Sequence, residues 1–131
     1  MSQNIAVPIT DSHVHFWETT KLQYPWLGDI PKINKPFFEE DYYQSLHPVA
    51  NDESVDGIIF VQCDCIREDA IREVEFVTEL ALRGHSRIKA IVAFAPIEEG
   101  EKGMNDTFNK LSLISIQFMT TSRISCKNIH S

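Results

Sequence analysis

Two nearly continuous apolar runs constrain the fold of this chain more than any other feature. Residues 57–63 read GIIFVQC, and a second run, IKAIVAFA, lies within residues 87–95. Such runs are typical of short parallel strands that are buried on both faces. Between them, residues 68–83 carry apolar side chains at helical spacing, and Gly84 stands where a helix is expected to stop. This order predicts an α/β fold with a parallel sheet and right-handed crossovers.

Two further elements are expected earlier in the chain. Residues 9–15 predict a first strand, and residues 39–46 predict a short helix with an acidic first turn. His47-Pro48 is expected to end that helix, because the residue before a proline avoids the helical region. Residues 51–56 are expected to form a polar turn. Strands and helices then alternate, so side chains at the carboxyl ends of the strands should meet at one edge of the sheet.

The composition limits the possible partners. The chain has 131 residues, a net charge of -7 and 43% hydrophobic residues, which indicates a soluble globular domain or a piece of one. The acidic balance argues against nucleic acid and anionic membranes as partners. No signal peptide is evident, and no apolar run approaches the ~18 residues of a membrane span. Three cysteines are too few for a disulfide framework, so reduced thiols and a cytoplasmic location are expected.

His13 and His15 form the clearest candidate site. They are separated by one residue at the end of the first predicted strand, so both side chains should point to the same face. Neutral imidazoles on one face can share a divalent metal ion. Catalytic zinc normally has three protein ligands, and no convincing third ligand is evident. Asp64 and Glu98 qualify by position only, and His85 is interpreted as a surface residue.

Further candidates lie in residues 16–35, here called the aromatic loop, and at the end of the second strand. Residues 16–35 form a long loop that is rich in large rings, among them Trp17, which either cover a pocket or pack the loop onto the protein. Gln62 ends the second strand, where it either orients a substrate oxygen or satisfies the backbone. The acidic residues of the 68–83 helix are interpreted as a solvated face: Glu68, Asp69, Glu73, Glu75 and Glu79.

Several segments resemble a known family. The segments are DSHVHFWE, YPWL, GIIFVQCDC, EDAIREVEFV and RIKAIVAFAPIE. Together they are similar to the amidohydrolase-related hydrolases, and in particular to the sugar-lactonase-like branch with fuconolactonase- and rhamnonolactonase-type enzymes. The resemblance covers residues 9–102, and its most specific part is the D-x-H-x-H-F-W opening.

The resemblance implies a fold and a reaction. The family fold is a (β/α)8 barrel, of which this chain would supply the first three β/α units. His13 and His15 would be metal ligands, with zinc the expected ion, and Trp17 and Gln62 would face the substrate. The implied reaction is hydrolytic opening of a lactone or a related ester, a small-molecule substrate. No position matches the family's catalytic base, so none is assigned.

The chain departs from the family pattern after residue 102. An eight-stranded barrel needs about 250 residues, and the composition changes near Gly103, beyond which only Asp106 is acidic. We therefore expect one domain over residues 1–102 and an irregular tail over residues 103–131. One hypothesis is that the tail is translated from an unspliced intron, because Gly103-Met104-Asn105 can be encoded by a sequence that contains a splice donor. The chain would then be a truncated and inactive form.

A second hypothesis belongs to another class of protein. The chain would be a small, complete α/β binding module in which the histidines hold a ligand or serve the structure without catalysis. Exposed strand edges distinguish the two hypotheses, because an opened barrel would associate with itself through unpaired strands. A complete module would cover its edges and remain monomeric.

Overall fold

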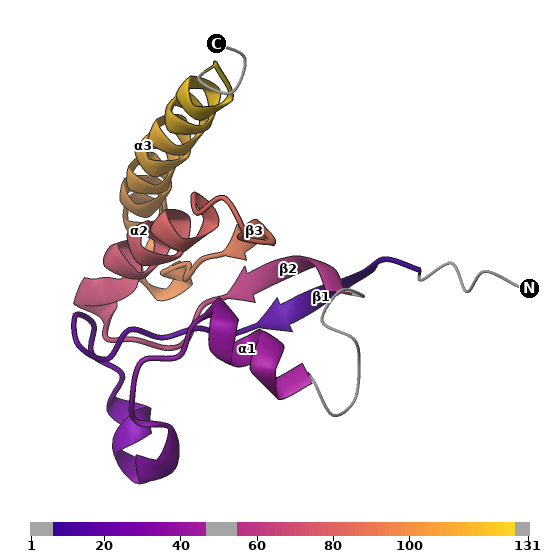
Figure 1. Ribbon diagram of the computed structural model, residues 1–131. Coiled ribbons are helices and arrows are strands. Elements are labelled where there is room, and N and C mark those ends of the chain that lie inside the picture. The colour runs from indigo at the N-terminus through magenta and orange to yellow at the C-terminus, as the bar shows by residue number, and fades with distance from the viewer. Residues whose placement is uncertain (1–6, 47–54, 128–131) are drawn as a thin grey trace, which may run out of the picture.

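The chain forms a three-stranded parallel sheet with helices between the strands. In the computed structural model, residues 7–46 and 55–127 are described, with residues 116–127 described by their helical backbone alone. The elements are β1 (Ile9–Val14), α1 (Glu39–Leu46), β2 (Val55–Val61), α2 (Ala70–Ala81), β3 (Ile88–Val92) and α3 (Gly100–Lys127). The sheet has the order β1-β2-β3, and both pairs are parallel (Figure 1). The predicted α/β fold with a parallel sheet is therefore confirmed.

Most predicted elements occur close to their expected bounds. Helix α1 matches residues 39–46, and β1 ends one residue before His15. Strand β2 begins at Val55, so it takes in the last part of the predicted polar turn. The rest of that turn and the His47-Pro48 pair lie outside the described residues. Helix α2 is shorter than predicted because a 3₁₀ turn, Arg67–Asp69, precedes it.

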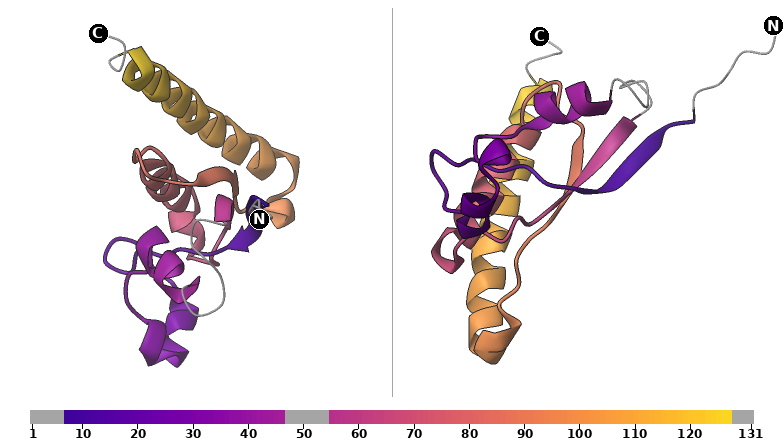
Figure 2. Two further views of the ribbon diagram at one scale, coloured as in Figure 1. Left: turned by 45° about the vertical axis from the view of Figure 1, so that its right-hand side comes forward. Right: turned by 90° about the horizontal axis from the view of Figure 1, so that it is seen from below.

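The hydrophobic core lies on one side of the sheet. Ile58 and Phe60 of the central strand are fully buried, and they cluster with Phe16 from the long loop and Val77 from α2. The alternate residues of β2, Ile59 and Val61, are only partly buried. Strands β1 and β3 form the two edges of the sheet (Figure 2), and each has one buried residue. Within residues 7–46 and 55–127, the sheet therefore has one face covered by helices and one open face.

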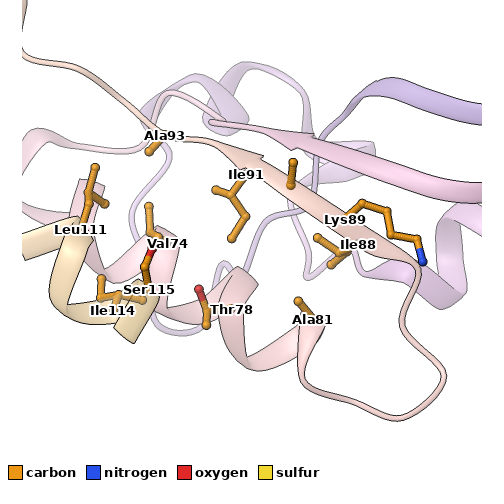
Figure 3. Close-up of a pocket in the computed structure, with 11 residues that line it drawn as sticks. Val74, Thr78, Ala81, Ile88, Lys89, Ile91, Ala93, Leu111, Ile114 and Ser115 are labelled. Atoms are coloured by element: carbon orange, nitrogen blue, oxygen red, sulfur yellow. The ribbon is translucent and has the colours of Figure 1, made fainter. Parts of the chain in front are cut away.

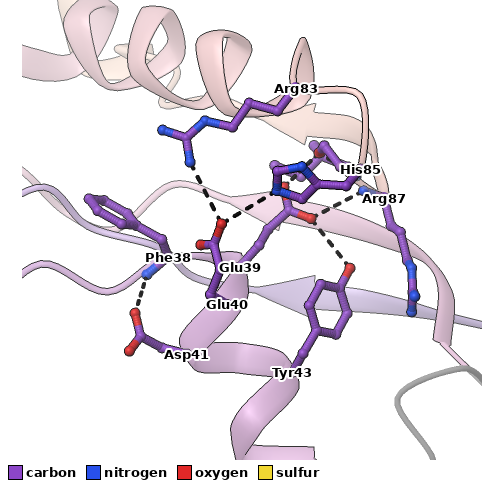
Figure 4. Close-up of polar contacts among 10 residues, drawn as sticks. Phe38, Glu39, Glu40, Asp41, Tyr43, Arg83, His85 and Arg87 are labelled. Carbon is purple, nitrogen blue, oxygen red and sulfur yellow. Dashed lines mark hydrogen bonds and ion pairs between the residues drawn. The ribbon is translucent and has the colours of Figure 1, made fainter.

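Helix α1 is tied to the start of β3 by a buried carboxylate. Glu39 accepts hydrogen bonds from Ser86 Oγ at 2.6 Å and from the Arg87 backbone N–H at 3.1 Å (Figure 4). At the helix start, Asp41 Oδ2 accepts the Phe38 backbone N–H at 2.9 Å, the return bond of a capping box. The two bonds of Glu39 hold the start of α1 against the amino end of β3, whereas the predicted site lies at the carboxyl end of β1.

The predicted irregular tail is wrong, because the chain continues as a single helix to Lys127. Gly103, Thr107, Leu111 and Ile114 recur at helical spacing and are buried or partly buried. Helix α3 contacts both α2 and the 3₁₀ turn Ile97–Glu99 that precedes it. This stripe begins with a glycine and a threonine, so a search for apolar periodicity does not detect it. The expected boundary at residues 102 and 103 falls inside α3, and residues 128–131 lie outside the described part of the chain.

An apolar hollow of about 350 Å³ separates α3 from the edge of the sheet (Figure 3). Helix α3 packs against α2 and leaves space beside β3. The side chains around this space are mainly aliphatic: Val74, Ala81, Ile88, Ile91, Leu111 and Ile114.

Candidate functional site

The end of β1 brings two imidazoles together on the open side of the sheet. The Nε2 atoms of His13 and His15 are 3.1 Å apart, and the rings meet edge to face with centroids 4.8 Å apart. The intervening Val14 and the following Phe16 are buried in the core on the opposite face. The predicted same-face arrangement of the two histidines is present, and their role as metal ligands remains a prediction.

A hydrogen bond from β2 orients one of these rings. His15 Nδ1 lies 2.9 Å from the carbonyl oxygen of Val61, and only a protonated Nδ1 can donate to that oxygen. In a neutral ring with this bond, the lone pair of His15 resides on Nε2, the atom that faces His13. A backbone acceptor behind the ring is the arrangement that fixes the tautomer of metal-binding histidines.

The carboxylate of Asp11 bonds to the backbone and to a tyrosine and does not point a free oxygen at the two imidazoles. Its Oδ1 accepts the backbone N–H of His13 at 3.1 Å, and its Oδ2 accepts the hydroxyl of Tyr42 at 2.8 Å. Burial and the bond to Asp11 raise the pKa of Tyr42 to about 12, so the phenol stays protonated and donates. Both oxygens of Asp11 are thus occupied by structural contacts.

The separation of the two Nε2 atoms is short enough for a hydrogen bond between the rings, and it is also near the separation of two zinc ligands. Zn–N bonds of tetrahedral geometry place two ligand nitrogens about 3.3 Å apart, close to the observed 3.1 Å. Within the described residues, no group of three or more histidine, cysteine, aspartate or glutamate side chains could hold a metal ion. Asp64 and Glu98, considered by position alone, do not complete such a group.

A hollow of about 310 Å³ opens beside His15. It is lined by side chains of the aromatic loop and of the turn after β2: His15, Trp17, Trp26, Gln62, Cys63 and Asp64. The two predicted substrate-binding residues, Trp17 and Gln62, therefore lie in the same hollow as a predicted metal ligand. Their contact with a substrate remains a prediction.

Trp17 packs the loop and walls the hollow at the same time. Its indole N–H donates to the carbonyl oxygens of Ile33 at 3.1 Å and Lys35 at 2.8 Å. Its ring stacks on Phe37 at 5.1 Å and meets Trp26 edge to face at 5.7 Å. Both interpretations of the aromatic loop thus apply, and Trp17 offers a ring surface rather than a hydrogen-bond donor.

Gln62 is held by the turn that follows it. Its Oε1 accepts the backbone N–H of Asp64 at 2.7 Å, and Asp64 has a positive φ of 53°. The amide nitrogen of this residue has no hydrogen-bond partner among the described residues, while its amide oxygen serves the backbone.

The interpretation of the α2 acids as a solvated face is wrong for two of them. Glu73 is 1% exposed and Asp69 is 3% exposed. Asp69 Oδ2 accepts the backbone N–H of Gln23 at 2.8 Å, and Oδ1 pairs with Arg72. Glu73 lies beside Val74 and Val77 on the buried stripe of the helix. Its place within the apolar stripe predicts burial, whereas its charge suggests an exposed position.

Two described cysteines and one further histidine remain to be placed. Cys63 and Cys65 are free thiols, as predicted. Burial raises the pKa of Cys65 to about 12 and raises that of Cys63 further, so both remain protonated. His85 is a surface residue with 67% of its side chain exposed, as predicted.

Comparison with known proteins confirms the predicted resemblance to the amidohydrolase-related lactonases. Over 85 residues, the chain is 33% identical to an L-fucono-1,5-lactonase of Burkholderia multivorans, a match that covers 64% of this chain and 26% of that enzyme. The chain thus spans about a quarter of the length of this curated relative. No protein-family model matches the chain.

A solved structure is also similar to this chain. It is an amidohydrolase 2 protein from Bifidobacterium longum subsp. infantis, which is 20% identical and has a TM-score of 0.46. The match covers 66% of this chain and 32% of that protein. Separately, no helix among the described residues has the length and hydrophobicity needed to cross a membrane.

Proposed function

We propose that residues 9–102 form the metal-holding end of a hydrolase that opens a sugar lactone or a similar cyclic ester. The facing Nε2 atoms of His13 and His15, with the Val61 carbonyl behind one ring, carry this proposal. The similarity to an L-fucono-1,5-lactonase of Burkholderia multivorans supports the substrate class. A bound divalent ion, with zinc expected, supplies Lewis acidity toward a carbonyl oxygen and activates water for attack.

The residues of this chain would bind and orient the substrate. The ring surfaces of Trp17 and Trp26 would pack against the apolar face of a sugar ring and exclude water from one side of the hollow. The amide nitrogen of Gln62 would donate a hydrogen bond to a substrate oxygen. Val61 would keep His15 in the tautomer that leaves Nε2 free.

We propose that the three β/α units are part of a (β/α)8 barrel and that the 131-residue chain does not turn over lactones alone. Catalytic zinc uses three protein ligands, whereas two imidazoles face each other here. A cytoplasmic location is part of the same proposal. The alternative is an α/β binding module in which the histidines bind a ligand without catalysis.

Zinc binding to matched variants tests the metal site. Equilibrium dialysis should show zinc bound to the wild-type chain and an affinity at least about tenfold lower for His13→Asn or His15→Asn. His85→Asn, which removes an exposed histidine elsewhere, should bind zinc like the wild type. Equal binding by all four proteins would contradict the proposal.

A lactone-opening assay then tests the reaction. Zinc-loaded chain should show no turnover of sugar lactones, and a polypeptide continued by the downstream genomic sequence should show turnover. Zinc binding without turnover in either form would favour the binding module, and turnover by the 131-residue chain would contradict the proposed inactivity.

A further inference from the structure

We propose that Glu73 is a positioning residue for the hollow: its carboxylate holds Cys63, and through Cys63 it holds the indole of Trp26. No role for Glu73 follows from the paired histidines or from the aromatic loop. The inference deepens the proposed function, since it treats the hollow as the substrate site, but its geometry is independent of metal and substrate.

Helix α2 places the carboxylate directly beneath the end of β2. Ala70, Val74 and Val77 turn the same face of the helix toward the core, and Glu73 lies among them. Its Oε1 accepts the backbone N–H of Cys63 at 3.0 Å. The N–H of the preceding residue, Gln62, still bonds to the Val92 carbonyl of β3. The chain leaves the sheet at the next residue, Cys63. The carboxylate of Glu73 therefore replaces a neighbouring strand as the acceptor for the first backbone N–H beyond the sheet.

Cys63 is held from its other side by the aromatic loop. Its carbonyl oxygen accepts the indole N–H of Trp26 at 2.8 Å, and its thiol donates to the carbonyl oxygen of Phe16 at 3.0 Å. The flanking residues, Gln62 and Asp64, line the hollow. A shift of Cys63 would therefore move three walls of the hollow together.

Burying Glu73 has a cost that an aliphatic residue at the same place would not have. Its second oxygen, Oε2, is buried without a hydrogen-bond partner among the described residues, and so is the hydroxyl of Tyr24. A buried polar atom without a partner destabilises a protein by about 1–3 kcal/mol. An aliphatic residue would avoid this cost but would offer no acceptor to Cys63.

Other contacts keep the two loops joined when Glu73 is changed. The backbone N–H of Gln23 donates to Asp69, and the N–H of Ile66 donates to the Gln23 carbonyl at 2.9 Å. Substitution at Glu73 should therefore loosen the hollow at Cys63 and Trp26 while the fold persists.

Tryptophan fluorescence tests this inference directly, because the only two tryptophans of the chain, Trp17 and Trp26, both line the hollow. Acrylamide is the probe, and a Trp17→Phe background leaves Trp26 as the sole emitter. Glu73→Leu should red-shift the emission and raise the acrylamide quenching constant. Glu73→Gln, which keeps an acceptor oxygen, should retain the wild-type emission and quenching.

Two further variants complete the test. Glu75→Leu, at an exposed position of the same helix, should leave quenching unchanged. Glu73→Asp keeps the carboxyl group but shortens the side chain, so it should raise quenching even if Glu73→Leu fails to fold. Wild-type quenching in folded Glu73→Leu or Glu73→Asp, or equal effects at Glu75, would overturn the inference. No metal or substrate is used, so failure of the proposed hydrolase function would leave this result unaffected.

Discussion

At the scale of single residues, the carboxyl group of Glu73 couples stability to pH. Burial raises its pKa to about 7, against the opposing hydrogen bond from Cys63. The neighbouring titratable groups are Tyr24, Cys63, Cys65 and Asp64. The unfolded chain has a glutamate pKa of about 4.3, so the folded state binds more protons between about pH 4.5 and pH 7. The free energy of unfolding should therefore fall as the pH rises through this window.

Glu73→Gln cannot titrate at this position and provides the matched comparison. Urea unfolding should show that the wild type loses up to about 3 kcal/mol relative to the variant between pH 4.5 and pH 8. Parallel pH profiles for the two proteins would show that Glu73 titrates normally.

At the scale of elements, the packing at the start of α3 requires a residue without a side chain at position 103. A Cβ atom at this position would overlap the Cβ of Glu99 and lie 2.6 Å from its Oε2. Glu99 crosses here to form a bidentate pair with Arg67. Alanine favours a helix by about 1 kcal/mol over glycine, but overpacking costs about 1–3 kcal/mol. Gly103→Ala should therefore lower stability by about 1 kcal/mol.

Gly84→Ala is the control, because nothing lies within 4 Å of a Cβ at that position. Chemical denaturation should show no loss of stability for this variant. A Gly103→Ala protein at least as stable as the wild type would contradict the overlap.

Elements with regular apolar spacing could be predicted from the sequence, and elements with polar or small residues in the stripe could not. Apolar residues at the spacing of a strand or a helix predict β2, β3 and α2. Helix α3 does not, because Gly103 and Thr107 occupy its buried face. The same reason applies in the site: the spacing of His13 and His15 fixes their shared face, whereas the charge of Glu73 suggests a surface position that its neighbours override.

At the scale of the whole molecule, the free edge of β3 should govern association. Among the described residues the sheet ends at β3, whose Val92 is 50% exposed, and the apolar hollow lies beside this strand. Unpaired apolar edges pair with further copies of a chain. Sedimentation velocity should show concentration-dependent association that Val92→Lys reduces, whereas Leu82→Lys, at the end of α2, should not. A monomer at all concentrations would favour the complete binding module.

The facing imidazoles are the central claim, and X-ray absorption at the zinc edge tests them most directly. The spectrum of zinc-loaded wild-type chain should show two imidazole ligands, since the two Nε2 atoms are 3.1 Å apart. The count should fall to one in His13→Asn and stay at two in His85→Asn. Zinc without imidazole scattering, or a spectrum unchanged by His13→Asn, would contradict the account.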